Sequence, residues 1–577
     1  MSCSAGALSR LHWLGLAGTV MMAAPLDAQS IERNLPPAPV LTPSAPPVAP
    51  IGASDSDKTP LGPPVRALVL LGASDPLVRG AAEGVDLSRL VDAPAAKLRA
   101  RLAAQLGQPL SRALLSDLRK TIVLAYRAHG HPFLTVVAPP QPIDAGVLQM
   151  RVVVFHLGRK TVSPADAAHA DRVARSVRVQ PGEMLSAPQI AEDLAWLNRN
   201  PYRKVESTLS PGSDPGTTDL TLQVAPSKPW SFYAGYANSG TPQTGRSRFF
   251  AGFQAALPGL PDGAISYQTT VSGDAITKPG DPFSDASHPL YISHAARMSL
   301  SPAPRQAFEF AADYVHTNVT VEDFLVRQWT LETSALYRSA ASNLVPGAVG
   351  SVAFGVEFKR QYLRTLFGDF EAFRASQDVI QLRASYNFEA TGPRDNLSLE
   401  LAVKVSPGGL DGRNDDRSLT DFAFGVPHHA RYAFVTGQAG LVHQLGHGWV
   451  LQSDMFGQFA PRTLPLTEAI GIGGPSQVRA YTLDDGSFDQ GVVSRTTLRL
   501  SPGLIRMARR LSPYLLADAG YGAAHGEASA VASAFGAGAD YRCGFMIFNG
   551  EVAVAATNAG RTRAGSSRFN LRITSLF

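Results

Sequence analysis

The stretch QDVIQLRASYNFEA, residues 377–390, alternates apolar and polar residues with a period of two. Its apolar positions are Ile380, Leu382, Ala384, Tyr386 and Phe388, and its polar positions are Gln381, Arg383, Ser385, Asn387 and Glu389. Successive side chains of a β-strand point to opposite faces, so the pattern predicts a strand with one apolar and one wet face. Residues 396–405 repeat it, with Leu397, Leu399, Leu401 and Val403 opposite Ser398, Glu400 and Lys404.

About sixteen segments of this kind follow Trp230, where helical periodicity disappears from the sequence. They start near residues 230, 245, 263, 289, 306, 325, 347, 376, 394, 430, 446, 490, 510, 531, 543 and 567. The connections after the second, fourth, sixth and eighth segments are short: 258–262, 301–305, 339–346 and 389–394. Several others are long: 273–288, 405–429 and 460–489. Short turns at one rim and long loops at the other are typical of a bacterial outer-membrane β-barrel.

A soluble β-sandwich would also alternate, so the last segment, RFNLRITSLF, is informative. It places Phe569, Leu571, Ile573 and Phe577 on one face and Arg568, Asn570, Arg572 and Thr574 on the other. An apolar exterior with charges facing inward fits lipid outside and water inside. Together with the even strand number and the asymmetric loops, this pattern favours the barrel. We expect the apolar face of this segment to act as the signal for barrel assembly.

The beginning of the chain predicts export. An apolar stretch, Leu11–Ala24, lies beside Arg10 and His12, is too short to cross a bilayer as a helix, and is followed by the small-residue site Leu26-Asp27-Ala28. We therefore expect residues 1–28 to be a signal peptide. A buried N-terminal helix is the weaker alternative, because the stretch runs into the proline-rich residues 29–64, whose composition predicts a linker.

The overall composition excludes several classes of protein. With 45% hydrophobic and 17% charged residues, 52 Gly and 43 Pro, the chain is expected to form several domains with many turns. It has no apolar run of about 20 residues, the length of a membrane-spanning helix. Cys3 would leave with the signal peptide and Cys543 has no partner, so disulfides are not expected. The net charge of +5 is mild and no basic cluster interleaves with aromatic residues, which argues against nucleic-acid binding.

Two small α+β domains are predicted between the linker and the barrel. Residues 65–157 contain, in order, a strand (66–71), two helices (95–106 and 111–129) and two strands (133–138 and 147–157). Residues 158–226 predict a second domain of like order, closed by the strand pair 204–209 and 218–224. Two consecutive small domains suggest a repeated binding module.

A glycine-rich stretch, GIGGPSQVRAY (residues 471–481), lies within the long connection 460–489. Taken alone, it indicates an ordinary turn with a solvated arginine. In its context, however, the sequence resembles the outer-membrane transporters of two-partner secretion, the TpsB class or haemolysin secretion/activation proteins. The resemblance rests on Pro181-Gly182-Glu183, 194–201, 211–222, Asn238–Pro242 with Thr244–Arg246, and Gly473–Pro475 with Val478–Tyr481.

This resemblance implies a fold, a location and a function. The two small domains would be periplasmic POTRA domains, and residues 227–577 would form a sixteen-stranded barrel in the outer membrane. The POTRA domains would recognise an unfolded partner exoprotein, a TpsA-type adhesin or haemolysin, and the barrel would form the pore that passes it to the cell surface. The other implied partners are outer-membrane lipid and the barrel-assembly machinery.

Two motifs carry the expected site. Val478-Arg479-Ala480-Tyr481 corresponds to the Val-Arg-Gly-Tyr at the tip of the family's sixth extracellular loop, and Leu516-Ala517-Asp518-Ala519-Gly520 corresponds to the family's motif on strand thirteen. By resemblance, Arg479 should pair with Asp518 inside the lumen. Ala480 replaces the motif glycine, which raises the question of whether the tip needs a positive φ that alanine tolerates poorly.

Other functions find little support in the sequence. It contains no nucleophile elbow and no nucleotide-binding loop, so neither an enzyme nor a cofactor is expected. His129 and His131, like His428 and His429, lack nearby cysteines or a carboxylate cluster, which favours turn histidines over a metal site. Only Ser30–Leu35 could form the helix that occupies the pore in many family members. The remaining alternatives are a barrel-assembly insertase, which usually carries more POTRA domains, and a passive porin, which needs none.

Overall fold

The computed structural model describes Glu32, Asn34 and residues 55–80, 82–90, 95–131, 133–143, 145–163, 167–214, 216–226, 228–260, 262–277, 289–392, 394–504, 509–526 and 528–577. The predicted signal peptide and most of the predicted linker lie outside these residues. The chain divides into two compact units: residues 41–227 form one, and residues 228–577 with residues 1–40 form the other. Among the described residues, no helix has both the length and the apolar character needed to cross a membrane.

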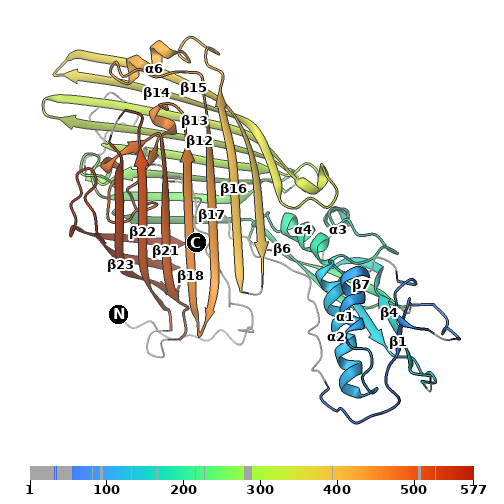
Figure 1. The fold of residues 1–577 in the computed structure, drawn as a ribbon. Coiled ribbons are helices and arrows are strands. Elements are labelled where there is room, and N and C mark those ends of the chain that lie inside the picture. Colours follow the sequence, from blue (N-terminus) through green and yellow to red (C-terminus); the bar gives the residue numbers. More distant parts are fainter. Residues whose placement is uncertain are drawn as a thin grey trace. The chain divides into compact units, whose positions relative to one another are not determined.

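The first α+β fold of the smaller unit contains a four-stranded sheet with the order β2-β1-β4-β3. Its elements are β1 (Ala67–Leu71), β2 (Gly84–Asp86), α1 (Ala95–Ala103), α2 (Arg112–Ala128), β3 (Leu134–Val137) and β4 (Val147–Val154). Helices α1 and α2 lie alongside each other on the sheet (Figure 1), where Leu98 and Ile122 pack against Leu68 of the central strand. Ser111 caps α2, because its hydroxyl accepts a hydrogen bond from Leu114 N at 3.2 Å.

The second α+β fold contains a three-stranded sheet with the order β5-β7-β6. Its elements are β5 (His156–Ser163), α3 (Ala167–Ser176), α4 (Ala187–Leu197), β6 (Arg203–Pro211) and β7 (Thr217–Pro226). Ile190, Leu194 and Leu197 of α4 form a core with Leu220 and Leu222 of β7. The predicted strand pair is present as β6 and β7, which pair antiparallel. Helix α3 and the short strand β2 were not anticipated from the sequence.

Sixteen strands within the described residues close into an antiparallel barrel, as the alternation predicts. They are β8 (Trp230–Ala237), β9 (Arg248–Ala256), β10 (Ala264–Ser272), β11 (Tyr291–Leu300), β12 (Gln306–Val321), β13 (Phe324–Ala340), β14 (Ser351–Phe367), β15 (Phe370–Thr391), β16 (Asp395–Ser406), β17 (Tyr432–Gly446), β18 (Trp449–Phe459), β21 (Gln490–Leu500), β22 (Leu511–Ala523), β23 (Ala530–Cys543), β24 (Met546–Ala555) and β25 (Ser567–Leu576). Each pairs with its neighbours in the chain, and β25 pairs with β8 to close the ring.

The burial of the alternating residues excludes the soluble sandwich. On β15, Leu382 and Tyr386 are 57% and 41% exposed, whereas Gln381 and Ser385 on the opposite face are 0% and 7% exposed. A soluble sheet buries its apolar face, so this inverted arrangement requires an apolar solvent outside the barrel and a polar interior. Strand β14 shows the same inversion, with exposed Phe354 and Val356 and buried Glu357 and Lys359.

The connections between barrel strands are of two kinds. At one rim, β9 leads to β10, and β11 to β12, through short turns, as predicted. At the other rim, two-residue turns join β12 to β13 and β14 to β15, whereas long loops carry the helices α5 (Asp274–Thr277) and α6 (Asp416–Phe422). Figure 1 shows the barrel strands side by side from β12 to β18 and on through β21 to β23, with α6 at the ends of β14 and β15. The loop between β18 and β21 differs from the others, because it lies inside the barrel.

Candidate functional site

The loop of residues 460–489 folds back on itself and packs against the inner wall. Its short strands β19 (Ile470–Gly471) and β20 (Ser487–Phe488) pair antiparallel, and η2 (Leu466–Glu468) and η3 (Leu483–Asp485) flank the tip. Four apolar side chains of the loop are fully buried in a cluster with small residues of β23 and β24. The loop contributes Ile470, Ile472, Val478 and Tyr481, and the wall contributes Ala532, Ala534, Ala553 and Ala555. These alanines leave the space that the loop fills.

Two glycines of β22 also leave space for the loop. A Cβ atom added at Gly520 would lie 3.1 Å from Cγ2 of Val478, and one added at Gly522 would lie 2.3 Å from the ring of Phe488. The second distance is too short for any side chain, so a larger residue at position 522 would push β20 away from the wall. Gly520, the glycine of the predicted Leu516–Gly520 motif, therefore leaves room for Val478 of the loop to pack against β22.

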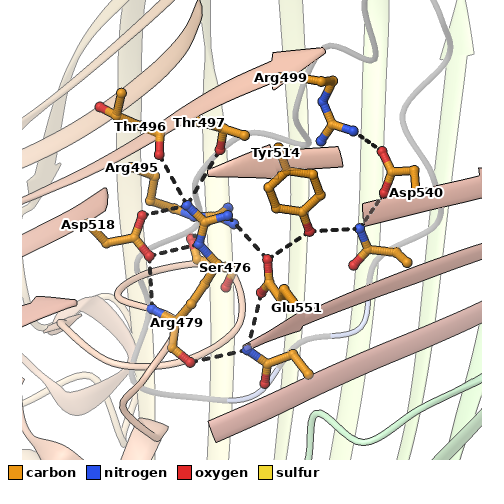
Figure 2. A network of polar contacts seen from close by, with 12 residues as sticks. Ser476, Arg479, Arg495, Thr496, Thr497, Arg499, Tyr514, Asp518, Asp540 and Glu551 are labelled. Carbon is orange, nitrogen blue, oxygen red and sulfur yellow. Dashed lines mark hydrogen bonds and ion pairs between the residues drawn. The ribbon is translucent and has the colours of Figure 1, made fainter. Parts of the chain in front are cut away.

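Arg479, at the tip of the loop, forms a two-pronged ion pair with Asp518 of β22. Its Nη2 and Nε atoms donate to Oδ1 and Oδ2 of Asp518 at 2.6 and 2.7 Å, and its backbone N–H donates to Oδ2 at 3.1 Å (Figure 2). The two side chains are 4% and 0% exposed. A planar guanidinium matches a carboxylate in this geometry, and burial shields the pair from water. The reading of Arg479 as a solvated turn residue is therefore wrong.

A second carboxylate, Glu551 of β24, also faces Arg479. Its Oε2 atom lies 3.3 Å from Nη1 of Arg479 and accepts a hydrogen bond from the hydroxyl of Tyr514 at 3.0 Å (Figure 2). Asn570 of β25 joins Glu551 to the loop, because its amide donates to Glu551 at 3.1 Å and to the carbonyl of Arg479 at 3.2 Å. Sequence reasoning missed Glu551. The sequence feature that could have identified it is a single acidic residue among apolar ones, at a position that the strand alternation places on the inward face.

The residues on either side of Arg479 are anchored too. Tyr481 is fully buried, and its hydroxyl donates to the carbonyl of Thr557 at 2.7 Å and lies 3.1 Å from the carbonyl of Ser533. Ala480 is 5% exposed and has an ordinary backbone. Within the described ranges, the non-glycine residues with positive φ are Asp262, Arg305, Glu322, Phe424 and His447. The tip therefore needs no left-handed residue at position 480, and alanine fits there without strain.

The four apolar residues at the end of the chain that the sequence singles out, three on β25 and Phe577 directly after it, do not join this cluster. Phe569 and Phe577 are 54% and 60% exposed, and Leu571 and Ile573 are partly exposed. The opposite face of the strand meets the loop, since Arg568 donates to the carbonyl of Tyr481 at 3.3 Å. The sequence-derived residues thus separate into a lumenal set around Arg479 and an outward set on β25.

The N-terminal segment also reaches the barrel wall. Glu32 accepts hydrogen bonds from Nη2 and Nε of Arg248 at 2.6 and 2.7 Å, and Arg248 is fully buried with its guanidinium over the ring of Tyr291. Asn34 donates to the hydroxyl of Tyr291 at 3.0 Å. Neither Glu32 nor Asn34 is helical, and the rest of the stretch considered for a helix, residues 30–35, is outside the described residues. No feature of the sequence pointed to Arg248.

The histidines noted in the sequence lie in loops, and His129 is in a turn. His129 caps the end of α2, and His429 lies 2.8 Å from Asp416 at the start of α6. The backbone N–H of Ala430 and the neighbouring His429 lower the pKa of the Asp416 carboxyl. Across the described ranges, no group of three or more His, Cys, Asp or Glu side chains is arranged to hold a metal ion.

Comparison with known proteins agrees with this architecture. The pattern of the family described as haemolysin secretion/activation protein ShlB/FhaC/HecB matches residues 216–543, and that of the ShlB-type POTRA domain matches residues 81–154. The chain is 25% identical over 410 residues to the heme/hemopexin transporter protein HuxB of Haemophilus influenzae, which covers 68% of this chain and 67% of HuxB. It is 26% identical over 145 residues to the outer membrane transporter CdiB-2 of Burkholderia pseudomallei, which covers 25% of this chain and 24% of CdiB-2.

Solved structures share the fold. CdiB from Escherichia coli superimposes with a TM-score of 0.67 at 16% identity, over 96% of this chain and 94% of CdiB. CdiB from Acinetobacter baumannii gives a TM-score of 0.58 at 13% identity, over 89% and 90% of the two chains. At these identities the likeness concerns the fold alone. Because the family pattern spans most of the barrel together with the strand that leads into it, this chain belongs to the haemolysin secretion/activation protein family ShlB/FhaC/HecB.

Proposed function

We propose that this protein secretes a partner exoprotein, passing it from the periplasm through the barrel to the cell surface. It resides in the bacterial outer membrane, with its POTRA domain region in the periplasm, as members of its family do. The cargo would be an adhesin or haemolysin of the TpsA type. The relatives named above are transporters, and we infer that this chain likewise moves a polypeptide and catalyses no chemical reaction.

The observation that carries this proposal is the loop packed inside the barrel with Arg479 on Asp518. A passive porin needs an open lumen, whereas a loop held in the lumen by a buried ion pair gives a pathway that must be opened for cargo. The loop tip fixes Val478, Arg479, Ala480 and Tyr481 against β22 to β25. We propose that these four residues, with Asp518 and Gly520, set the resting position of this gate.

Cargo recognition would occur at the free edge of β6. This strand lies at one edge of its sheet, and its 9 residues make it long enough to pair with an extended segment. Near the start of β6 the edge is already hydrogen-bonded, because the side chain of Asn198 accepts from the N–H of Val205 at 2.7 Å and donates to its carbonyl at 3.0 Å. The N–H and C=O groups of successive residues point to alternate sides of a strand. Those of Ser207 and Leu209 therefore point away from β7, to the same side as those of Val205.

The other edge of this sheet is less available. At the start of β5, Leu157 donates to the carbonyl of Glu183 at 2.8 Å and accepts from Gly182 at 2.7 Å. Further along, Lys160 turns inward and its amine donates to the carbonyls of Val177 and Val179, where burial lowers its pKa. An inward-pointing charge and a covered start protect β5 from pairing, which leaves β6 as the preferred docking strand.

Delivery to the membrane would follow the usual route of exported barrels. We propose that residues 1–28 are removed as a signal peptide. Phe569, Leu571, Ile573 and Phe577 would then be read by the barrel-assembly machinery and afterwards contact lipid. The exposure of Phe569 on the outer face of β25, and of Phe577 directly after this strand, supports this role. A porin-like conductance would accompany opening of the loop.

A barrel-assembly insertase is the alternative, and the two functions predict different phenotypes. The test expresses the full-length protein with the epitope-tagged product of the adjacent open reading frame, and measures that product in the medium and on the cell surface. We expect export that depends on the transporter. Loss of other outer-membrane barrels on depletion, with no effect on the tagged protein, would instead support an insertase.

The docking strand is tested in the same assay. Leu209→Pro removes an N–H that faces the open side of β6, so it should reduce export while the barrel remains assembled. Thr208→Pro is the matched control, because Thr208 faces β7 and its replacement should unfold the sheet. Normal export by Leu209→Pro would place cargo recognition elsewhere.

A further inference from the structure

The first half of the loop, residues 460–469, contacts a different part of the barrel from the tip. Glu468, whose side chain is 1% exposed, forms ion pairs with Lys359 of β14 and, at 3.6 Å, with Lys404 of β16. Gln381 of β15, between these strands, donates to the same carboxylate at 3.0 Å. Leu464 packs beside it in a cluster with Val379, Tyr432, Phe434 and Ala460. Neither the loop motif nor the ion pair of Arg479 involves these residues.

The two contact regions lie at different places along the inner wall. Glu468 contacts β14, β15 and β16 through Lys359, Gln381 and Lys404, and its carbonyl accepts a hydrogen bond from Gln458 of β18 at 2.7 Å. Arg479 contacts β22 and β24 through Asp518 and Glu551. The loop is therefore attached to the wall at two separate places.

The two attachments differ in strength. Arg479 has a two-pronged ion pair with Asp518 and a second carboxylate at 3.3 Å, and the same half of the loop is held by Tyr481 and by Asp485, which accepts from Arg561 N at 2.8 Å. Glu468 is held by lysines, whose ammonium groups act as point charges without the fixed geometry of a guanidinium. Both lysines also have other carboxylates, Glu332 at 3.9 Å from Lys359 and Glu357 at 3.1 Å from Lys404.

We propose that Glu468 is a positioning residue, a second and releasable anchor that holds the first half of the loop against the wall of β14 to β16. When the ion pairs of Glu468 break, residues 460–469 leave the wall of β14 to β16, while the tip stays fixed at Asp518. The lysines keep their other carboxylates, so release exposes no unpaired ammonium group. The geometry of the anchor stands by itself, and its consequence for cargo passage rests on the proposed function.

Two arginines of the loop make release measurable. Arg462 lies in the first half and is exposed, whereas Arg479 lies in the tip and is 3% exposed. Purified full-length protein in lipid bilayers is treated with trypsin, and cleavage after each arginine is followed by mass spectrometry. In Glu468→Gln, we expect cleavage after Arg462 to accelerate about tenfold, the change in an opening equilibrium when a charge-assisted hydrogen bond is lost. Arg479 should stay protected, and the ion conductance of the same preparation should rise.

The variant should fold, because Lys359 and Lys404 retain Glu332 and Glu357. The matched control is Asp313→Asn, which removes an inward carboxylate whose partner is Arg297 of the neighbouring strand, at 2.7 Å. Unchanged cleavage after Arg462, equal exposure of Arg479, or the same effect in Asp313→Asn would overturn the proposal. None of these measurements uses cargo, so a failure of the secretion assay leaves the test of Glu468 intact.

Discussion

Removing Arg479 is expected to destabilise the barrel more than removing its partner Asp518. Arg479→Ala deprives two carboxylates, Asp518 and Glu551, of their cation, and their side chains are 0% and 8% exposed. Breaking a buried pair in this way costs about 3–5 kcal/mol in the free energy of unfolding. Asp518→Ala leaves Arg479 beside Glu551 at 3.3 Å, so its cost should be nearer the ~1.5–3 kcal/mol of a charged hydrogen bond.

The double variant separates a true pair from two independent residues. Once Arg479 is gone, removing Asp518 relieves a buried unpaired carboxylate. The cost of Arg479→Ala with Asp518→Ala should therefore fall short of the sum of the two single costs by about 0.5–3 kcal/mol. Asp518→Ala should also loosen the tip, because the same carboxylate accepts a hydrogen bond from the backbone N–H of Arg479 at 3.1 Å.

The assay is urea unfolding of the purified protein in lipid vesicles, followed by tryptophan fluorescence, with protease accessibility of residues 460–489 measured in parallel. Arg499→Ala is the control, since Arg499 pairs with Asp540 on the same wall without touching the loop, and both are more than 20% exposed (Figure 2). It should cost little and leave the loop protected. If the unfolding costs of Arg479→Ala and Asp518→Ala are strictly additive, or if both single variants are near-neutral, the ion pair does not hold the loop in position.

Three further outcomes are expected. Replacing Phe577 by Asp should reduce the amount of heat-modifiable barrel in outer-membrane fractions, whereas an unchanged yield would contradict its role in assembly. A fragment of residues 55–226 should show a cooperative unfolding transition and bind the N-terminal secretion domain of its cargo at about micromolar strength in calorimetry, as a transient interface does; normal secretion by a barrel lacking these residues would contradict this. Glu32→Gln weakens the ion pair with Arg248, whose Nη2 atom lies 2.6 Å from Glu32, so it should increase proteolysis of the N-terminal segment without lowering barrel yield. Equal proteolysis of the variant and the unaltered protein would show that this ion pair does not hold the segment.

The sequence alone determined the approximate positions of the barrel strands and the face that their alternating side chains take. Strand alternation is local, since it follows from the pleat of the backbone and needs no knowledge of the neighbouring strand. The predicted starts near 490 and 567 coincide with those of β21 and β25, and the inversion of burial on β15 follows the predicted faces. The ion pair of Arg479 with Asp518 was also expected, but from family resemblance, because nothing in either local pattern relates the two residues.

Only the tertiary structure decided what the loop touches. Glu551 and Asn570 meet Arg479, and Glu468 meets Lys359 and Lys404, because the closed ring brings distant strands to face one another. Which inward residues approach across a lumen depends on the number of strands, their stagger and their tilt. These are properties of the whole barrel, and the alternation within any one strand carries no information about them.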